Sequence, residues 1–146
     1  MTDLKVKIKV ETFCHATEDL NKVLKSIQNV IGLEPQKYKL SKLLGHWKNP
    51  IIHVYVEINE EEEAISILKN LFSKMDEKDK KIIFHNKELY MDEQGKMYLR
   101  FDKQEAYNGR LMLSSSDDII KVVIQIQNVR KEKIIEAYKY LGIFHE

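Results

Sequence analysis

Three polar stretches of the chain carry side chains that could bind a nucleic acid. They are FCHATED (residues 13–19), GHWKNP (45–50) and RFDKQEAYNGR (100–110). The first joins a predicted strand to a predicted helix, and the free amides at a helix N-terminus can receive a phosphate. The second provides Trp47 for stacking on a base, with a lysine and an amide beside it. The third combines basic, amide and phenolic groups, so all three stretches favour contact with RNA.

Each stretch also has a purely structural explanation. Trp47 could fill a corner of the hydrophobic core, and Asp102 could cap a helix over KQEAY. Tyr107 could be a core residue that keeps only its hydroxyl in water. The sequence alone leaves both explanations open.

A basic strand is predicted near the beginning of the chain. Lys5, Lys7 and Lys9 alternate with apolar residues, so a strand here has one apolar face and one face with three ammonium groups. The lysines could protect an edge strand from pairing with another chain, or they could form a stripe that faces phosphates. The net charge of the whole chain is only +1, so any attraction to a nucleic acid must be local.

The usual signatures of catalysis are missing from the sequence. It has no glycine-rich phosphate loop and no GxSxG, HExxH or CxxC motif. Cys14 and His15 are neighbours on a predicted strand, so their side chains point to opposite faces. The five histidines lack the spacing of a metal site, and we expect no enzyme activity, no cofactor and no metal. One enzymatic alternative gathers His15, His46 and Asp102 in a single cleft.

Length and composition indicate one folded domain over residues 1–146. The chain is 43% hydrophobic and 32% charged, which is typical of a soluble globular protein. The charged start MTDLKVKIKV is unlike a signal peptide, and no apolar run approaches the length of a membrane span. The single cysteine agrees with a reducing compartment, so we expect a cytoplasmic protein.

The hydrophobic periods alternate between strand and helix. After the basic strand, a helix is expected from an N-cap at Thr17 to a stop at Gly32. A strand over residues 36–44, with Tyr38, Leu40 and Leu43 pointing inward, leads through GHWKNP to a central strand over residues 51–58. Asn59 is expected to cap the next helix, whose glutamates suit the helix dipole.

The second half of the chain is less regular. A short helix is expected after residue 76, followed by two short strands joined by a turn at residues 93–95. IIKVVIQIQ (119–127) predicts a β-branched strand, and the chain closes with an amphipathic helix built on Ile134, Tyr138 and Leu141. This order predicts an α+β fold with a mixed, largely antiparallel sheet and helices packed on one face.

At the same three stretches the chain resembles a known family. FCHATED, GHWKNP and LRFDKQEAYNGRL, followed by DDIIKVVIQI, are similar to an archaeal family described as predicted RNA-binding proteins and exosome-associated subunits. The order of the motifs matches across nearly the whole chain. The resemblance implies a fold like that of ribosomal protein L-five and a role in RNA binding. The chain departs from the family pattern at Lys48, where a second glycine is expected.

The resulting prediction is a noncatalytic RNA-binding module associated with RNA processing. The residues expected to contact RNA, single-stranded or structured, are Lys5, Lys7, Lys9, His15, Thr17, His46, Trp47, Lys48, Asn49, Lys103, Gln104, Tyr107 and Arg110. Exosome or other ribonucleoprotein subunits are the expected protein partners. The alternative is a protein-interaction subunit that uses the same turns to dock on a ribonucleoprotein assembly.

Overall fold

A computed structural model describes residues 4–35, 37–45 and 49–144 of the chain. Within them, five antiparallel strands form one sheet in the order β2-β3-β1-β5-β4. The strands are β1 (Lys5–Cys14), β2 (Lys39–Leu44), β3 (Pro50–Ile58), β4 (Met97–Asp102) and β5 (Ile119–Gln127). The helices are α1 (Leu20–Ile31), α2 (Glu61–Lys74), α3 (Glu77–His85), α4 (Lys87–Tyr90), α5 (Lys103–Tyr107) and α6 (Ile134–Leu141), with a 3-10 turn at Lys131–Lys133.

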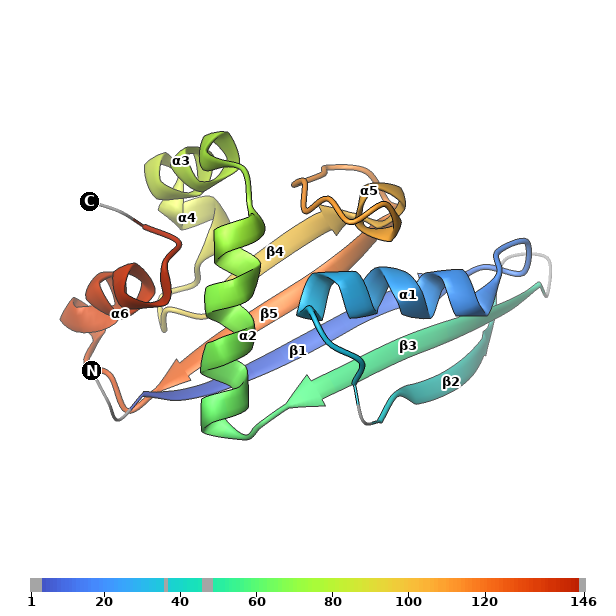
Figure 1. Cartoon of the computed structure of the whole chain (residues 1–146), viewed down its shortest axis with the longest axis horizontal. Helices are drawn as coiled ribbons and strands as arrows, with labels where there is room; N and C mark the ends of the chain where they lie inside the picture. The colour runs from blue at the N-terminus through green and yellow to red at the C-terminus, as the bar shows by residue number, and fades with distance from the viewer. Residues whose placement is uncertain (1–3, 36, 46–48, 145–146) are drawn as a thin grey trace.

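The helices lie on one side of the sheet. In Figure 1, α1 and α2 cross in front of the strands, while α3 and α4 lie beside the β4 edge. Among the described residues, no helix covers the opposite face of the sheet. The predicted α+β class with helices on one face is therefore confirmed, and every strand pairing is antiparallel. No helix in the described ranges is long and apolar enough to cross a membrane.

The basic strand β1 lies at the centre of the sheet. Val6, Ile8 and Val10 are buried against the helices, because alternate residues of a strand face the same side. The explanation of its lysines as protection of an edge strand is wrong, since β1 pairs with β3 on one side and with β5 on the other. The expectation that residues 51–58 form a strand inside the sheet is confirmed. Their strand, β3, lies between β1 and the edge strand β2.

The two long helices begin one or two residues later than expected. Asp19, rather than Thr17, caps α1, and its side chain accepts a hydrogen bond from the amide of Asn21. Glu60, rather than Asn59, caps α2 by accepting from two first-turn amides. The stop at Gly32 is confirmed, with a φ of 86° in the left-handed region that glycine tolerates.

The segment between α2 and β5 contains more helix than expected. Residues 87–90 form α4, so the first of the two predicted short strands is wrong. Only a single bridge, Met91 with Met97, remains of that pairing. The turn is confirmed, and Gly95 adopts a φ of 84° there while its carbonyl accepts a hydrogen bond from the Tyr138 hydroxyl at 2.6 Å.

In Figure 1, no helix crosses in front of the edge strand β2. Leu40 and Leu43 are 50% and 47% exposed, so the prediction that they point into the core is wrong. Leu44 is 77% exposed. A strand with one neighbour and no helix above it cannot bury its apolar side chains.

Candidate nucleic-acid interface

The side of the sheet that faces away from the helices forms a continuous surface, here called the open face. Because paired residues of antiparallel strands share a face, the registers define which side chains belong to it. They are Lys39, Ser41 and Leu43 of β2, Ile51, His53, Tyr55 and Glu57 of β3, Lys5, Lys7, Lys9, Glu11 and Phe13 of β1, Ile119, Lys121, Val123, Gln125 and Gln127 of β5, and Tyr98, Arg100 and Asp102 of β4.

Positive charge exceeds negative charge on the open face. Lys5, Lys7 and Lys9 stand in a row along the central strand, with about 7 Å between successive residues. Lys39, Lys121 and Arg100 add cations on the flanking strands, against the carboxylates of Glu11, Glu57 and Asp102. The chain therefore has a local basic surface although its net charge is only +1.

Aromatic rings continue the open face beyond Lys9, at the end of β1 where Tyr55 pairs with Glu11 and His53 with Phe13. Phe13 is 45% exposed, and its ring centroid lies 5.2 Å from that of His53. The ring centroids of His53 and Tyr55 are 6.3 Å apart. Tyr98 lies across the sheet on β4, with the Lys121 Nζ 5.6 Å from its ring centroid. Rings on an exposed sheet face can stack on unpaired bases, and adjacent cations can bind the phosphates.

Hydrogen bonds and ion pairs hold several of these groups in place. The Glu11 carboxylate lies 2.9 Å from the His53 Nε2 and 4.0 Å from the Lys121 Nζ. The Tyr55 hydroxyl donates to Glu57 at 2.7 Å. Burial, and then this hydrogen bond, raise the pKa of Tyr55 to about 12, while the same bond lowers the pKa of Glu57. Tyr55 is therefore an uncharged ring at neutral pH, which suits stacking.

Sequence reasoning placed only part of this surface. It identified the three lysines of β1, but it missed His53, Tyr55 and Tyr98. The alternation in IIHVYVEI puts His53 and Tyr55 on one face, although the pairing of Phe13 with His53 needs the register of β1 and β3. That register joins residues far apart in the chain, so local periodicity does not contain it.

A second group of predicted residues lies at the junction of α1 and α5, on the helix side of the sheet (Figure 1). Thr17, Lys103, Gln104 and Tyr107 line a hollow of about 330 Å³ there. His15 and Thr17 are exposed, as is Arg110, whose Nε lies 3.5 Å from Glu105. These residues therefore do not share a surface with the β1 lysines.

Lys103 has a structural role that the sequence did not reveal. Its side chain is only 3% exposed, and its Nζ lies 2.9 Å from Glu18 and 3.0 Å from Asp118. The ammonium also donates to the Phe13 carbonyl at 2.7 Å. These three partners already engage the ammonium, so the geometry disfavours the expected RNA contact of Lys103. The motifs that contain these residues meet to satisfy one buried charge.

Gln104 takes part in the same cluster. Its side-chain amide donates to the second carboxylate oxygen of Asp118 at 3.0 Å. Burial by itself would raise the pKa of Asp118, but the hydrogen bonds from Gln104 and Lys103 outweigh it and lower that pKa. The Asn29 amide binds the last carbonyls of α5, at 2.9 Å from Ala106 O and 3.1 Å from Tyr107 O. The conformation of α5 is thus fixed at both ends.

Part of the tryptophan turn falls outside the described residues. His46, Trp47 and Lys48 lie in that part of the chain. On either side of it, the Gly45 amide donates to the Asn49 carbonyl at 2.8 Å, and Leu44 pairs with Pro50. The turn therefore closes a hairpin between β2 and β3, as the glycine and proline predict, and the Asn49 side chain is exposed.

The enzymatic alternative requires His46, which lies outside the described residues. The Asp102 carboxylate caps α5 by accepting from the amide of Glu105, as the structural explanation predicts. Burial and the nearby Glu18 raise the pKa of the Cys14 thiol, which disfavours a reactive thiolate. In the described ranges, no three His, Cys, Asp or Glu side chains come together as metal ligands.

Comparisons with known proteins agree with a nucleic-acid role. A family model described as RNA binding matches residues 7–126. The chain is 33% identical over 138 residues to the RNA-binding protein PAB1135 of Pyrococcus abyssi, a match that covers 90% of each chain. It is also 36% identical over 125 residues to an uncharacterized protein of Methanocaldococcus jannaschii, covering 82% of this chain and 83% of that one.

A solved structure shows the same fold. The crystal structure of protein AF2318 from Archaeglobus fulgidus, a DUF54 protein, is 31% identical and superposes with a TM-score of 0.79. The superposition covers 95% of this chain and 99% of that one. The family model spans most of the chain and the Pyrococcus relative aligns along nearly its whole length, so this chain belongs to the family described as RNA binding.

Proposed function

We propose that the protein binds RNA through the open face of its sheet and does so without catalysis. One observation carries the proposal: the open face carries Lys5, Lys7 and Lys9 along the first half of its central strand and the Phe13, His53 and Tyr55 rings at the other end of that strand. Lysines on a central strand cannot serve to block an edge. Their position therefore favours the other explanation, a stripe that faces phosphates.

The chemistry of the surface favours unpaired over duplex RNA. Phe13, His53 and Tyr55 form a row of rings, and bases can lie on such rings only when they are not stacked in a helix. The β1 lysines would meet the phosphates of the same strand. Binding of this kind weakens with salt, because each phosphate contact releases condensed counterions.

Other predicted contacts remain proposals, although several of these residues lie on the helix side of the sheet and not on the open face. One of them is the stacking of an unpaired base on Trp47, which lies outside the described residues. The remaining residues in this group are His15, Thr17, His46, Lys48, Asn49, Gln104, Tyr107 and Arg110. A single RNA-binding domain over residues 1–146, the cytoplasmic location, the exosome association and the likeness to ribosomal protein L-five remain predictions.

The test is a fluorescence-anisotropy titration with labelled single-stranded RNA, duplex RNA and single-stranded DNA. The variant Lys5→Gln/Lys7→Gln/Lys9→Gln should reduce the slope of log affinity against log salt by about 2. At 0.1 M salt its affinity for single-stranded RNA should fall by up to about a hundredfold.

The matched control removes the same charge from the helix layer. Lys25, Lys74 and Lys81 are exposed on α1, α2 and α3, and their triple glutamine variant should keep an affinity close to wild type. Equal losses in the two triple variants would show that binding follows total charge, and would contradict the open face as the site.

Protein docking is a second candidate because of the β2 edge. Leu40, Leu43 and Leu44 are exposed there beside unpaired backbone groups, which is an arrangement that can accept a partner strand. A ribonucleoprotein subunit could bind this edge. Loss of partner binding in Leu43→Lys/Leu44→Lys, with RNA affinity unchanged, would support this candidate.

A further inference from the structure

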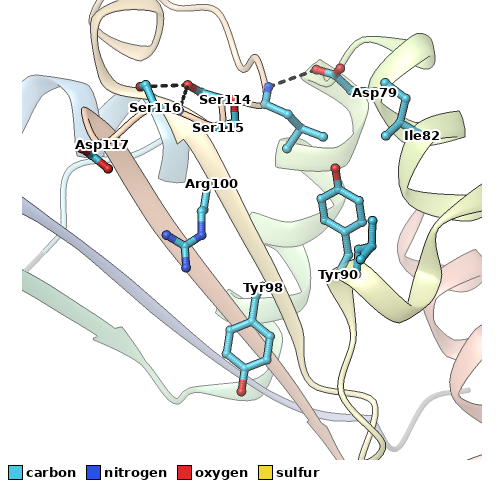
Figure 2. A pocket seen from close by; sticks show the side chains of 11 residues that line it. Asp79, Ile82, Tyr90, Tyr98, Arg100, Ser114, Ser115, Ser116 and Asp117 are labelled. Carbon is cyan, nitrogen blue, oxygen red and sulfur yellow. Dashed lines mark hydrogen bonds between the residues drawn. The ribbon is translucent and has the colours of Figure 1, made fainter.

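A pocket of about 730 Å³ opens where the open face meets the β4 edge. Figure 2 shows Tyr98 and Arg100 on β4, Tyr90 at the end of α4, and the serines of the loop before β5 across the top. The volume lies within the range of pockets that hold small molecules. The pocket is thus large enough for a nucleotide.

One side of the pocket is apolar. Leu89 is 74% exposed and Ile82 is 38% exposed, and both line the cavity together with the Tyr90 ring. Exposed large apolar side chains in a concave site often mark contact with a ligand. A flat nucleobase could cover this wall and stack on the tyrosine.

The other side of the pocket is polar and carries a cation. The Arg100 side chain is exposed and forms no ion pair with any residue in the described ranges. Its planar guanidinium can bind a phosphate with two parallel hydrogen bonds. Ser115 contributes an exposed hydroxyl on the same side.

The loop that carries the serines is ordered by its own hydrogen bonds. The Ser114 hydroxyl donates to that of Ser116 at 3.0 Å, and the Ser116 amide donates back at 3.1 Å. The Asp79 carboxylate accepts from the Leu113 amide at 3.1 Å and so ties the loop to α3. Asp117 is exposed on the rim, where its carboxylate could accept from a ribose hydroxyl.

The pocket is continuous with the open face. Tyr98 and Arg100 belong to both, and their partners across the sheet are Val123 and Lys121. A strand of RNA that crosses β1 and β5 therefore reaches the pocket without leaving the basic surface. We infer that the pocket receives one unpaired nucleotide of the bound RNA strand. Its base lies on the apolar wall, and its phosphate lies at Arg100.

This inference rests on RNA binding by the open face, so its test separates the two. Ser115→Glu adds a carboxylate to the pocket without changing the sheet, and Ser66→Glu adds the same charge on the exposed side of α2. Arg100→Gln is compared with Lys121→Gln, which removes the neighbouring cation outside the pocket. Each variant is titrated with single-stranded RNA and, separately, with free AMP.

The expected result is an affinity for RNA about tenfold lower in Ser115→Glu than in Ser66→Glu. Arg100→Gln should likewise lower the affinity for RNA more than Lys121→Gln does. Equal effects within each pair, with RNA still bound by the wild type, would overturn the pocket and leave the open face intact. AMP binding that Ser115→Glu abolishes, without RNA binding by the wild type, would overturn both and assign the pocket to free nucleotides. Binding of neither ligand would also overturn both.

Discussion

At the residue scale, a side chain's position could be predicted where it depends on local sequence and not where it depends on distant contacts. The alternation of Lys5, Lys7 and Lys9 with apolar residues was enough to place their side chains on one face, because period 2 is a local property. Lys103 is also a lysine in a polar motif, yet it is buried between Glu18 and Asp118. Those partners lie 85 and 15 residues away in the chain, so its local sequence gave no sign of them.

The buried ammonium leads to a stability prediction. Lys103→Met leaves Glu18 and Asp118 facing each other without a cation, and should lower the free energy of unfolding by about 3 kcal/mol. Urea denaturation measures this change. Arg110→Gln, at a side chain 70% exposed, should change it by less than about 0.5 kcal/mol. Similar values for the two variants would show that the cluster does not stabilise the fold.

The lowered pKa of Asp118 predicts a pH dependence of stability. A carboxyl whose folded pKa lies below its ordinary value of 3.8 stabilises the fold above that value. This contribution is lost as the pH falls through the lowered folded pKa. The difference in unfolding free energy between wild type and Asp118→Asn should therefore be largest near neutral pH and shrink below about pH 4. A difference that stays constant down to pH 2 would contradict the ion pair.

At the scale of elements, long periodic segments were predictable and short ones were not. The buried stripes of α1, α2 and α6 follow from a period of 3.6, and the β-branched run of β5 follows from its composition. The four residues of α4 are too few for a period, and their apolar side chains suggested a strand. Its formation depends on contacts with β4 and α3.

A single side chain on α1 stabilises the short helix α5. The Asn29 amide donates to the carbonyls of Ala106 and Tyr107, so Asn29→Ala should lower the free energy of unfolding by about 1 to 2 kcal/mol. Asn21→Ala changes an exposed side chain on the same helix and serves as the control. Differential scanning calorimetry compares the two variants. Equal melting temperatures would show that these hydrogen bonds contribute nothing net.

At the scale of the whole molecule, the strand order creates the surface that the sequence could not show. The order β2-β3-β1-β5-β4 brings Phe13 beside His53 and sets Arg100 across from Lys121. Each of these pairs joins distant parts of the chain. The fold class could be predicted from local patterns, whereas the open face and its pocket needed the pairing of the strands.

The measurement that tests the central claim most directly is ultraviolet cross-linking of the protein to single-stranded RNA, with the modified residues identified by mass spectrometry. Stacked aromatic side chains are the expected sites of reaction. The account predicts cross-links at Phe13, Tyr55 and Tyr98, which lie on the open face. Cross-links confined to Tyr107 and Tyr140, which are exposed on α5 and α6, would contradict it.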